Sequence, residues 1–183
     1  MNNKTLKIIT YLAVFCALCF VSTLFIIIPL PNGYVNAGDI LVLTCAWCLG
    51  PIGAIAASLG SALADVLSGY VIYAPVTFVV KGLVALTAYF LYVLTKKTIK
   101  NDKFDFVARL ISAIIGEVIM VFGYFLFESI LYGFEGGMLA LLGNCLQGTF
   151  CAIGATLLIS ALYNIKPIKS TFKKLTVNKE ENE

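Results

Sequence analysis

Residues 36–82 read NAGDILVLTCAWCLGPIGAIAASLGSALADVLSGYVIYAPVTFVVKG. They hold two short apolar runs, 38–49 and 52–67, which meet at Gly50-Pro51 and contain 12 and 16 residues. A transmembrane helix needs roughly 20 apolar residues, so neither run is a typical span. Two structures fit: two short helices in a tightly packed bundle, or a re-entrant hairpin. The hairpin is possible because non-helical backbone is tolerated at membrane depth where protein or a water-filled cavity surrounds it.

Four longer apolar runs flank this stretch, at 8–28, 76–95, 107–131 and 138–163. The chain is 60% hydrophobic and 13% charged, whereas an average soluble domain is about 45–50% apolar and about 25% charged. This composition indicates a membrane protein and excludes an ordinary cytosolic enzyme, a disordered segment and a DNA-binding domain. The run 8–28 exceeds the roughly 7–15 residues of a signal-peptide core, so we predict that it is a retained helix.

We therefore predict an all-α membrane protein with a single domain, 1–165, of six transmembrane helices. Its second and third helices are short and joined at Gly50-Pro51. Twelve of the 13 Lys and Arg residues lie near the start, around the loop 96–106 or in the tail 166–183. By the positive-inside rule both termini and this loop are cytoplasmic. Four crossings, or two crossings plus a re-entrant pair, fit the first half of the chain. The tail, basic and then acidic, is predicted to be a solvated anchor of this topology.

Several kinds of site are excluded or disfavoured by the residues present. Histidine is absent, so no His-based triad, zinc site or proton relay can form. The Cys-x-x-Cys pairs Cys16/Cys19 and Cys45/Cys48 lie inside apolar spans, where small thiols pack, and we predict no metal site. No Gly-x4-Gly-Lys-Ser/Thr phosphate loop occurs, so the chain does not bind ATP in that way.

Polar side chains within the spans are the candidate functional residues, because an ionisable group in the membrane is costly. Most of them fall in one layer on the extracellular side of the midplane. Lys81 needs a counter-charge there, and Asp65, Glu117 and Glu128 are the available carboxylates. The predicted ligand-binding residues are Asn36, Asp39, Asp65, Tyr70, Tyr73, Lys81, Glu117, Tyr124, Asn144 and Gln147.

The same polar residues also have simpler explanations than ligand binding. The charges can form an ion pair that only stabilises the bundle, and Tyr70 and Tyr73 can belong to the aromatic belt of the interface. Asp39 is an N-cap, or it has a gating or ligand role. Trp47 is predicted to be an interface anchor. An intramembrane enzyme would need a nucleophile with a base, for which Ser61, Asp65 and Lys81 are the only conceivable set, so we predict no enzyme.

The first span contains Ala13 and Ala17, and small residues four apart let another helix approach closely. Further motifs are Asn36-Ala-Gly38-Asp39, Leu49-Gly50-Pro51-Ile52-Gly53-Ala54, Gly60-Ser61-Ala62-Leu63-Ala64-Asp65, Ser68-Gly69-Tyr70, Tyr73-Ala74-Pro75-Val76-Thr77 and Lys81-Gly82. Gly116-Glu117, Gly123-Tyr124 and Asn144 with Gln147-Gly148 follow later. By these residues the chain resembles the substrate-binding S component of energy-coupling factor (ECF) vitamin transporters, in the branch often labelled riboflavin-type.

The resemblance implies six helices around a ligand pocket near the outer face, with 29–37 and 68–75 as lids. It implies that Ala13 and Ala17 dock a transmembrane T component. Two separate cytoplasmic ATPase subunits would hydrolyse ATP, so no cofactor is expected in this chain. The implied location is the prokaryotic plasma membrane, as a multi-pass protein.

A pocket with one cation, carboxylates and amides suits a small polar heterocycle. We favour a B6 vitamer or hydroxymethylpyrimidine, with riboflavin, pantothenate and a queuosine precursor as further possibilities. The alternative function is a stand-alone proton-coupled carrier that uses Glu117 and Lys81 as its proton site.

Overall fold

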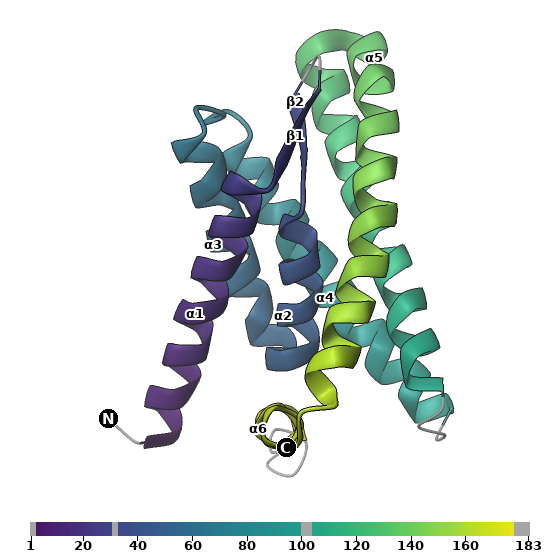
Figure 1. Cartoon of the computed structure of the whole chain (residues 1–183). Coiled ribbons are helices and arrows are strands. Elements are labelled where there is room, and N and C mark those ends of the chain that lie inside the picture. The colour runs from purple at the N-terminus through teal and green to yellow at the C-terminus, as the bar shows by residue number, and fades with distance from the viewer. Residues whose placement is uncertain (1–2, 31–32, 100–103, 178–183) are drawn as a thin grey trace.

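The structure is a computed structural model that describes residues 3–30, 33–99 and 104–177. Its elements are α1 (Asn3–Phe25), β1 (Ile27–Leu30), β2 (Gly33–Asn36), α2 (Gly38–Leu49), α3 (Gly53–Leu67), α4 (Ala74–Thr98), α5 (Asp105–Tyr163) and α6 (Lys166–Val177) (Figure 1). In the described part of the chain, four helical segments are long and apolar enough to cross a membrane: Thr5–Phe25, Gly38–Leu67, Ala74–Thr98 and Asp105–Tyr163. These segments agree with the predicted helical membrane protein, whereas six crossings and cytoplasmic termini stay predictions.

The two short apolar runs form α2 and α3, joined by a single turn of 3-10 helix, Gly50–Ile52. α2 ends where it does because Gly50 has φ 67° and ψ −149°, a left-handed conformation that glycine adopts easily. Pro51 follows it and has no N–H to continue the helix. Helix α3 starts at Gly53 directly after this turn.

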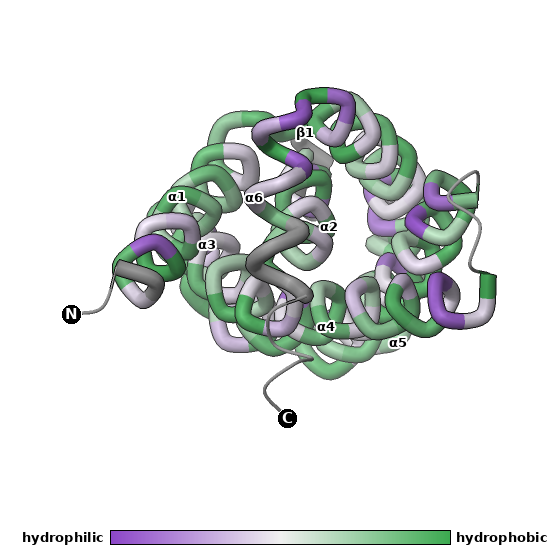
Figure 2. Tube along the Cα trace, turned by 90° about the horizontal axis from the view of Figure 1, so that it is seen from below, coloured by the Kyte–Doolittle hydropathy of each residue, from purple (hydrophilic) through white to green (hydrophobic). Residues whose placement is uncertain are grey.

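Helix α2 lies at the centre of the bundle. Ten of its 12 residues are buried, and it contacts α1, α3, α4, α5 and α6. Viewed along the bundle, α2 lies inside a ring of the other helices, with α6 across one end (Figure 2). A helix that is apolar on all sides is stable only in such a position. Most of its twelve residues are therefore surrounded by protein rather than exposed on the outside of the bundle.

Close packing of α1 on α3 depends on a small residue. A Cβ atom placed on Gly60 would lie 2.4 Å from the carbonyl oxygen of Cys16 and 2.9 Å from the Cβ of Cys19. The helices can approach this closely only because Gly60 has no side chain. Gly60 therefore lies on the surface of α3 that packs against α1.

Helix α5 is a hairpin of two arms, 105–132 and 134–163, which lie side by side (Figure 1). The chain reverses at Gly133, whose φ of 79° and ψ of 169° belong to a region that is essentially restricted to glycine. The arms touch well below the turn, since a Cβ on Gly148 would lie 3.0 Å from the Cβ of Glu117. The apolar runs 107–131 and 138–163 thus become two packed arms of one element.

Two elements depart from the sequence-based prediction. An antiparallel hairpin pairs β1 with β2, from Ile27 opposite Asn36 to Leu30 opposite Gly33, so the fold is not wholly α-helical. The segment predicted as a solvated tail begins with helix α6, and Phe172 of α6 packs against Tyr11 and Phe15 of α1. Lys100, Lys103, Lys179 and the acidic end of the tail lie outside the described residues.

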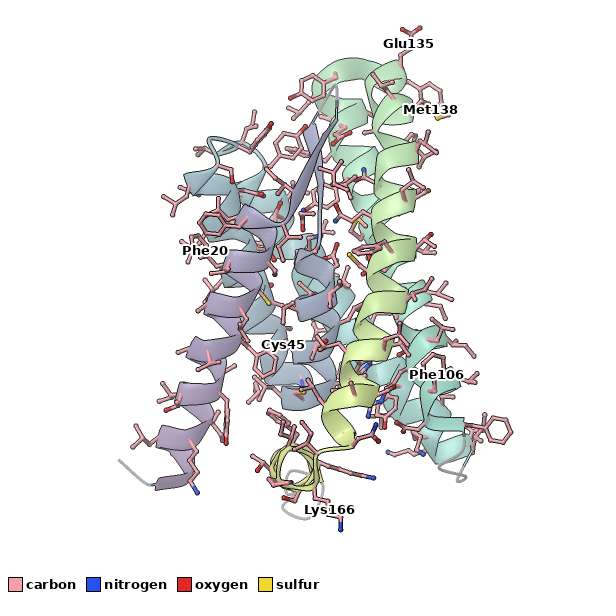
Figure 3. All side chains as sticks on the ribbon, in the orientation of Figure 1. Phe20, Cys45, Phe106, Glu135, Met138 and Lys166 are labelled. Carbon is pink, nitrogen blue, oxygen red and sulfur yellow. The ribbon has the colours of Figure 1, made fainter. Side chains whose placement is uncertain are left out.

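The two ends of the bundle differ in charge. Figure 3 labels Glu135 at the tip of the α5 hairpin and Lys166 at the opposite end. We call these the hairpin end, which also carries β1 and β2, and the terminal end, where both chain termini lie (Figure 1). Lys96 and Lys97 occupy the last turn of α4, at the terminal end. This polarity agrees in direction with the topology predicted from the basic residues.

Candidate functional site

A buried ion pair between Lys81 of α4 and Asp39 of α2 forms the centre of the candidate site. The Lys81 Nζ lies 2.7 Å from Oδ1 and 2.8 Å from Oδ2 of Asp39. The Lys81 side chain is 2% exposed and Asp39 is fully buried. Gln147, on the second arm of α5, donates to Asp39 Oδ2 at 2.7 Å. Three helices are thus joined through one carboxylate.

The β-hairpin contributes to the same group of residues. The backbone N–H of Asn36 donates to Gln147 Oε1 at 2.9 Å, and the Cys151 thiol lies 3.5 Å from the Asn36 carbonyl oxygen. The Asn36 side chain accepts from the backbone N–H of Gly38 at 2.8 Å and so satisfies a donor at the start of α2. Strand β2 and helices α2, α4 and α5 therefore meet at Asn36, Asp39, Lys81 and Gln147.

This arrangement corrects two predictions. Asp39 is not the N-cap of α2: Ala37 occupies that position and makes no side-chain cap. The counter-charge of Lys81 is Asp39, rather than Asp65, Glu117 or Glu128. Asp39 lies in the first turn of α2, where the helix dipole also favours a negative charge.

A second polar group lies beside the first. Thr77 donates to the Asp65 carboxylate, and its hydroxyl lies 2.9 Å from the Tyr124 hydroxyl. The Tyr124 ring is 5.3 Å from Lys81 Nζ, within the range of a cation–π contact. Thr77 was absent from the predicted set, although its spacing of four residues from Lys81 places both on one face of α4.

Glu117 is the least satisfied residue of the site. It is 3% exposed, and neither carboxylate oxygen has a hydrogen-bond partner among the residues that the structure describes. It interacts electrostatically with Asp39 and Lys81 and faces Gly148 on the other arm of α5, where a Cβ would lie 3.4 Å from Oε2. Asn144, one helical turn from Gly148, is half-buried, and its Nδ2 has no acceptor within the described part of the chain.

Aromatic residues lie at the hairpin end of this site. Tyr73 forms hydrogen bonds with Tyr132 and the buried Glu128, and its ring is 5.2 Å from Phe127 and 5.9 Å from Tyr70. Burial, together with these hydrogen bonds, raises the pKa of Tyr73 above its usual value. Tyr73 is therefore joined to α5, while Tyr70 is 38% exposed at the edge.

At the terminal end, Arg109 is buried among aromatic rings. Its guanidinium carbon is 4.3 Å from the centroid of Tyr92, 4.7 Å from Tyr163 and 5.4 Å from Trp47. Its Nε donates to Asp105 at 2.9 Å. The prediction that Trp47 is an interface anchor is wrong, since Trp47 is 2% exposed and packs on this arginine. Arg109 joins α2, α4 and both arms of α5 at this end.

The remaining predicted residues lie apart from the polar groups. Ala13 and Ala17 are exposed on α1. All six cysteines are free thiols, and no cluster of three metal-ligating side chains is present among the described residues.

The structure also separates the one conceivable catalytic set. Ser61 Oγ has no hydrogen-bond partner among the residues that the structure describes. Asp65 accepts from Thr77, and Lys81 pairs with Asp39. These three side chains therefore form no pair of nucleophile and base. The arrangement around Lys81 can instead bind: it offers a cation, carboxylates, amides and hydroxyls, all held by rigid helices.

The comparisons with known proteins agree with this description. Residues 3–164 match a family model described as ECF-type riboflavin transporter, S component. An uncharacterised protein in a gap 3' region of Pyrococcus woesei is 36% identical over 123 residues, which cover 66% of this chain and 76% of that protein. A solved structure titled as the structure and mechanism of the S component of a bacterial ECF transporter has the same fold, with a TM-score of 0.67 and 23% identity over 87% of this chain and 97% of that one. The chain therefore belongs to the ECF-type riboflavin transporter S component family, and it is a membrane-embedded substrate-binding subunit of an ECF vitamin transporter.

Proposed function

We propose that this chain binds a small polar vitamin or vitamin precursor at the group around Lys81, on the outer side of the membrane, as part of an ATP-driven importer. The observation that carries the proposal is the buried network of Asn36, Asp39, Lys81 and Gln147. It brings four elements together, and ionisable groups within a membrane are costly unless they serve a function. The predicted residues Asp65, Tyr70, Tyr73, Glu117, Tyr124 and Asn144 lie beside it or toward the hairpin end.

The proposed topology has six crossings with both termini in the cytoplasm. It counts α1, α2, α3, α4 and the two arms of α5 as one crossing each. Support comes from the basic residues at the terminal end, Lys96, Lys97 and Lys166, and from Glu135 at the hairpin end. The β1–β2 hairpin and the connection 68–73 then lie on the outer face, above the polar groups.

The proposed ligand follows from the charged side chains of the site. The family model is described as a riboflavin transporter component, whereas the charged groups here favour a smaller polar heterocycle such as a B6 vitamer or hydroxymethylpyrimidine. The full chain should be purified alone in detergent, and any co-purified metabolite identified by mass spectrometry. Binding should then be measured by calorimetry with B vitamins and their precursors. If no metabolite co-purifies and none binds, the proposal is wrong.

Docking of a T component is proposed at Ala13 and Ala17, which are exposed on α1. Ala17→Leu should leave ligand binding unchanged, because the residue lies away from the polar groups, yet block co-purification of the chain with a T component and two ATPases. Leu18→Ala, also on the exposed part of α1, is the control for a general effect on this helix. Recovery of the full complex with Ala17→Leu would contradict the proposed docking site.

A second candidate function is a stand-alone proton-coupled carrier, and the buried Glu117 beside Lys81 is the observation that favours it. The chain should be reconstituted alone in liposomes with a pH gradient. Uptake without partner subunits that is lost in Glu117→Gln would support this carrier. Uptake that needs the T component and ATP would support the importer.

A further inference from the structure

Some hydrogen-bonding groups at this site have no partner among the described residues, and they indicate which donors and acceptors the ligand carries. We propose that the ligand presents two adjacent N–H donors to the Glu117 carboxylate, as a protonated amino-substituted nitrogen heterocycle or another amidine does. This inference rests on the proposed function, since it concerns the same site, and it adds the chemical class of the bound molecule.

The first support is the hydrogen bonding of Glu117. Both carboxylate oxygens are buried and lack partners among the described residues, although the side chain is 3% exposed. A buried acceptor without a donor is unfavourable, and a carboxylate presents two parallel acceptors that match a pair of N–H groups. Gly148 has no side chain that could donate to Oε2, although its position is close enough that a Cβ there would lie 3.4 Å from this oxygen.

The second support is the balance of charge. Lys81 is the cation of this group, and it already contacts both oxygens of Asp39 at 2.7 and 2.8 Å. Glu117 interacts electrostatically with the same pair but has no cation of its own among the described residues. A ligand with a positive amidine-type edge supplies that cation, so that Glu117 can carry its charge while it is buried.

The third support is the position of Asn144. Its Nδ2 donor is also buried without an acceptor within the described part of the chain. Asn144 lies four residues before Gly148 on the second arm of α5 and therefore on the same face, about one helical turn of 5.4 Å toward the hairpin end. A ligand that also carries an acceptor, such as a hydroxyl oxygen or a ring nitrogen, can satisfy Asn144 as well.

A pair of probes that differ in one group tests the proposal. 4-Amino-5-hydroxymethyl-2-methylpyrimidine presents the two adjacent N–H donors when the ring nitrogen beside its amino group is protonated, whereas its 4-oxo analogue replaces the amino donor by a carbonyl acceptor. Riboflavin, whose pyrimidine edge has a carbonyl on each side of one N–H, is a third probe. We expect the wild-type chain in detergent to bind the amino compound at least roughly tenfold more tightly than the other two.

The variant Glu117→Gln sharpens this test, because its side-chain amide has one acceptor and one donor and so matches the oxo edge. We expect it to bind the amino compound about 10- to 100-fold more weakly than the wild type and to bind the oxo analogue more tightly. Glu135→Gln, the same change at an exposed residue, should alter neither affinity. In the absence of ligand, Glu117→Gln should unfold at the same temperature as the wild type or higher, because a buried carboxylate without a partner is removed.

The results of these binding and unfolding measurements separate failure of this inference from failure of the proposed function. Binding of riboflavin or the oxo analogue with an unchanged preference in Glu117→Gln would overturn the inference and leave the proposed function standing. A lower unfolding temperature of ligand-free Glu117→Gln would assign Glu117 a structural role and also overturn it. If none of the probes binds and no metabolite co-purifies, both the proposed function and this inference are wrong.

Discussion

Replacing Lys81 by methionine is the most direct test of the buried ion pair. Methionine keeps the unbranched shape of the lysine stem but removes the ammonium group, so Asp39 loses contacts of 2.7 and 2.8 Å. Breaking a buried pair by removing one partner costs about 3–5 kcal/mol. Since Gln147 still donates to Oδ2, we expect a loss near the lower end of this range.

The assay is thermal unfolding of the purified chain in detergent. For a protein of this size, about 3–5 kcal/mol corresponds to a fall in Tm of roughly 6–20 °C. The double variant Asp39→Asn with Lys81→Met, which removes both charges, should recover at least half of the loss. Lys97→Met, at an exposed position, is the matched control and should unfold like the wild type.

Two results would refute this reasoning. A Lys81→Met protein that unfolds within about 2 °C of the wild type would show that the ammonium group is not buried against Asp39. A double variant no more stable than Lys81→Met would show that lost packing, and not an uncompensated carboxylate, causes the change.

Three further variants test the packing around the site by the same unfolding measurement. Tyr124→Phe removes the hydroxyl contact with Thr77 and should cost about 1 kcal/mol; no change would mean that this contact does not persist in the protein. Gly60→Leu forces α1 away from α3, because its Cβ would lie 2.4 Å from the Cys16 carbonyl oxygen, and should cost about 1–3 kcal/mol or more. Leu63→Val is the control, because Leu63 is half-exposed on α3, and it should have little effect. Equal losses of stability in Gly60→Leu and Leu63→Val would contradict the close contact between α1 and α3. Gly133→Ala should cost about 1–3 kcal/mol through its backbone conformation alone, since nothing lies within 4 Å of the added Cβ; unchanged stability would place the reversal of α5 elsewhere.

Much of the helical framework could be predicted from local patterns. The runs 38–49 and 52–67 became α2 and α3 almost to the residue, because Gly50 and Pro51 end a helix whatever surrounds them. Lys81 and Glu117 were recognised as buried functional candidates, since charged residues within long apolar runs are rare and costly. Such signals depend on residues that are neighbours in the chain.

The sequence alone misassigned the partner of Lys81. The predicted partners, Asp65, Glu117 and Glu128, are the carboxylates available within the later apolar runs, whereas the observed partner, Asp39, is 42 residues away in the chain. The position of Trp47 was wrong for a similar reason: an aromatic residue near the end of a span suits the interface, but here Arg109 from a distant helix covers it. The β1–β2 hairpin and the packing of α6 on α1 were not predicted either.

Hydrophobicity and turn residues by themselves determined that this chain has helices apolar enough to cross a membrane and which ionisable residues lie within them, because both depend on the free energy of transferring local segments out of water. Only the tertiary structure decided which polar groups pair and which remain unsatisfied. That outcome depends on how helices distant in sequence are placed against one another, and Asp39, joined to Lys81 and to Gln147 108 residues away, depends entirely on this placement.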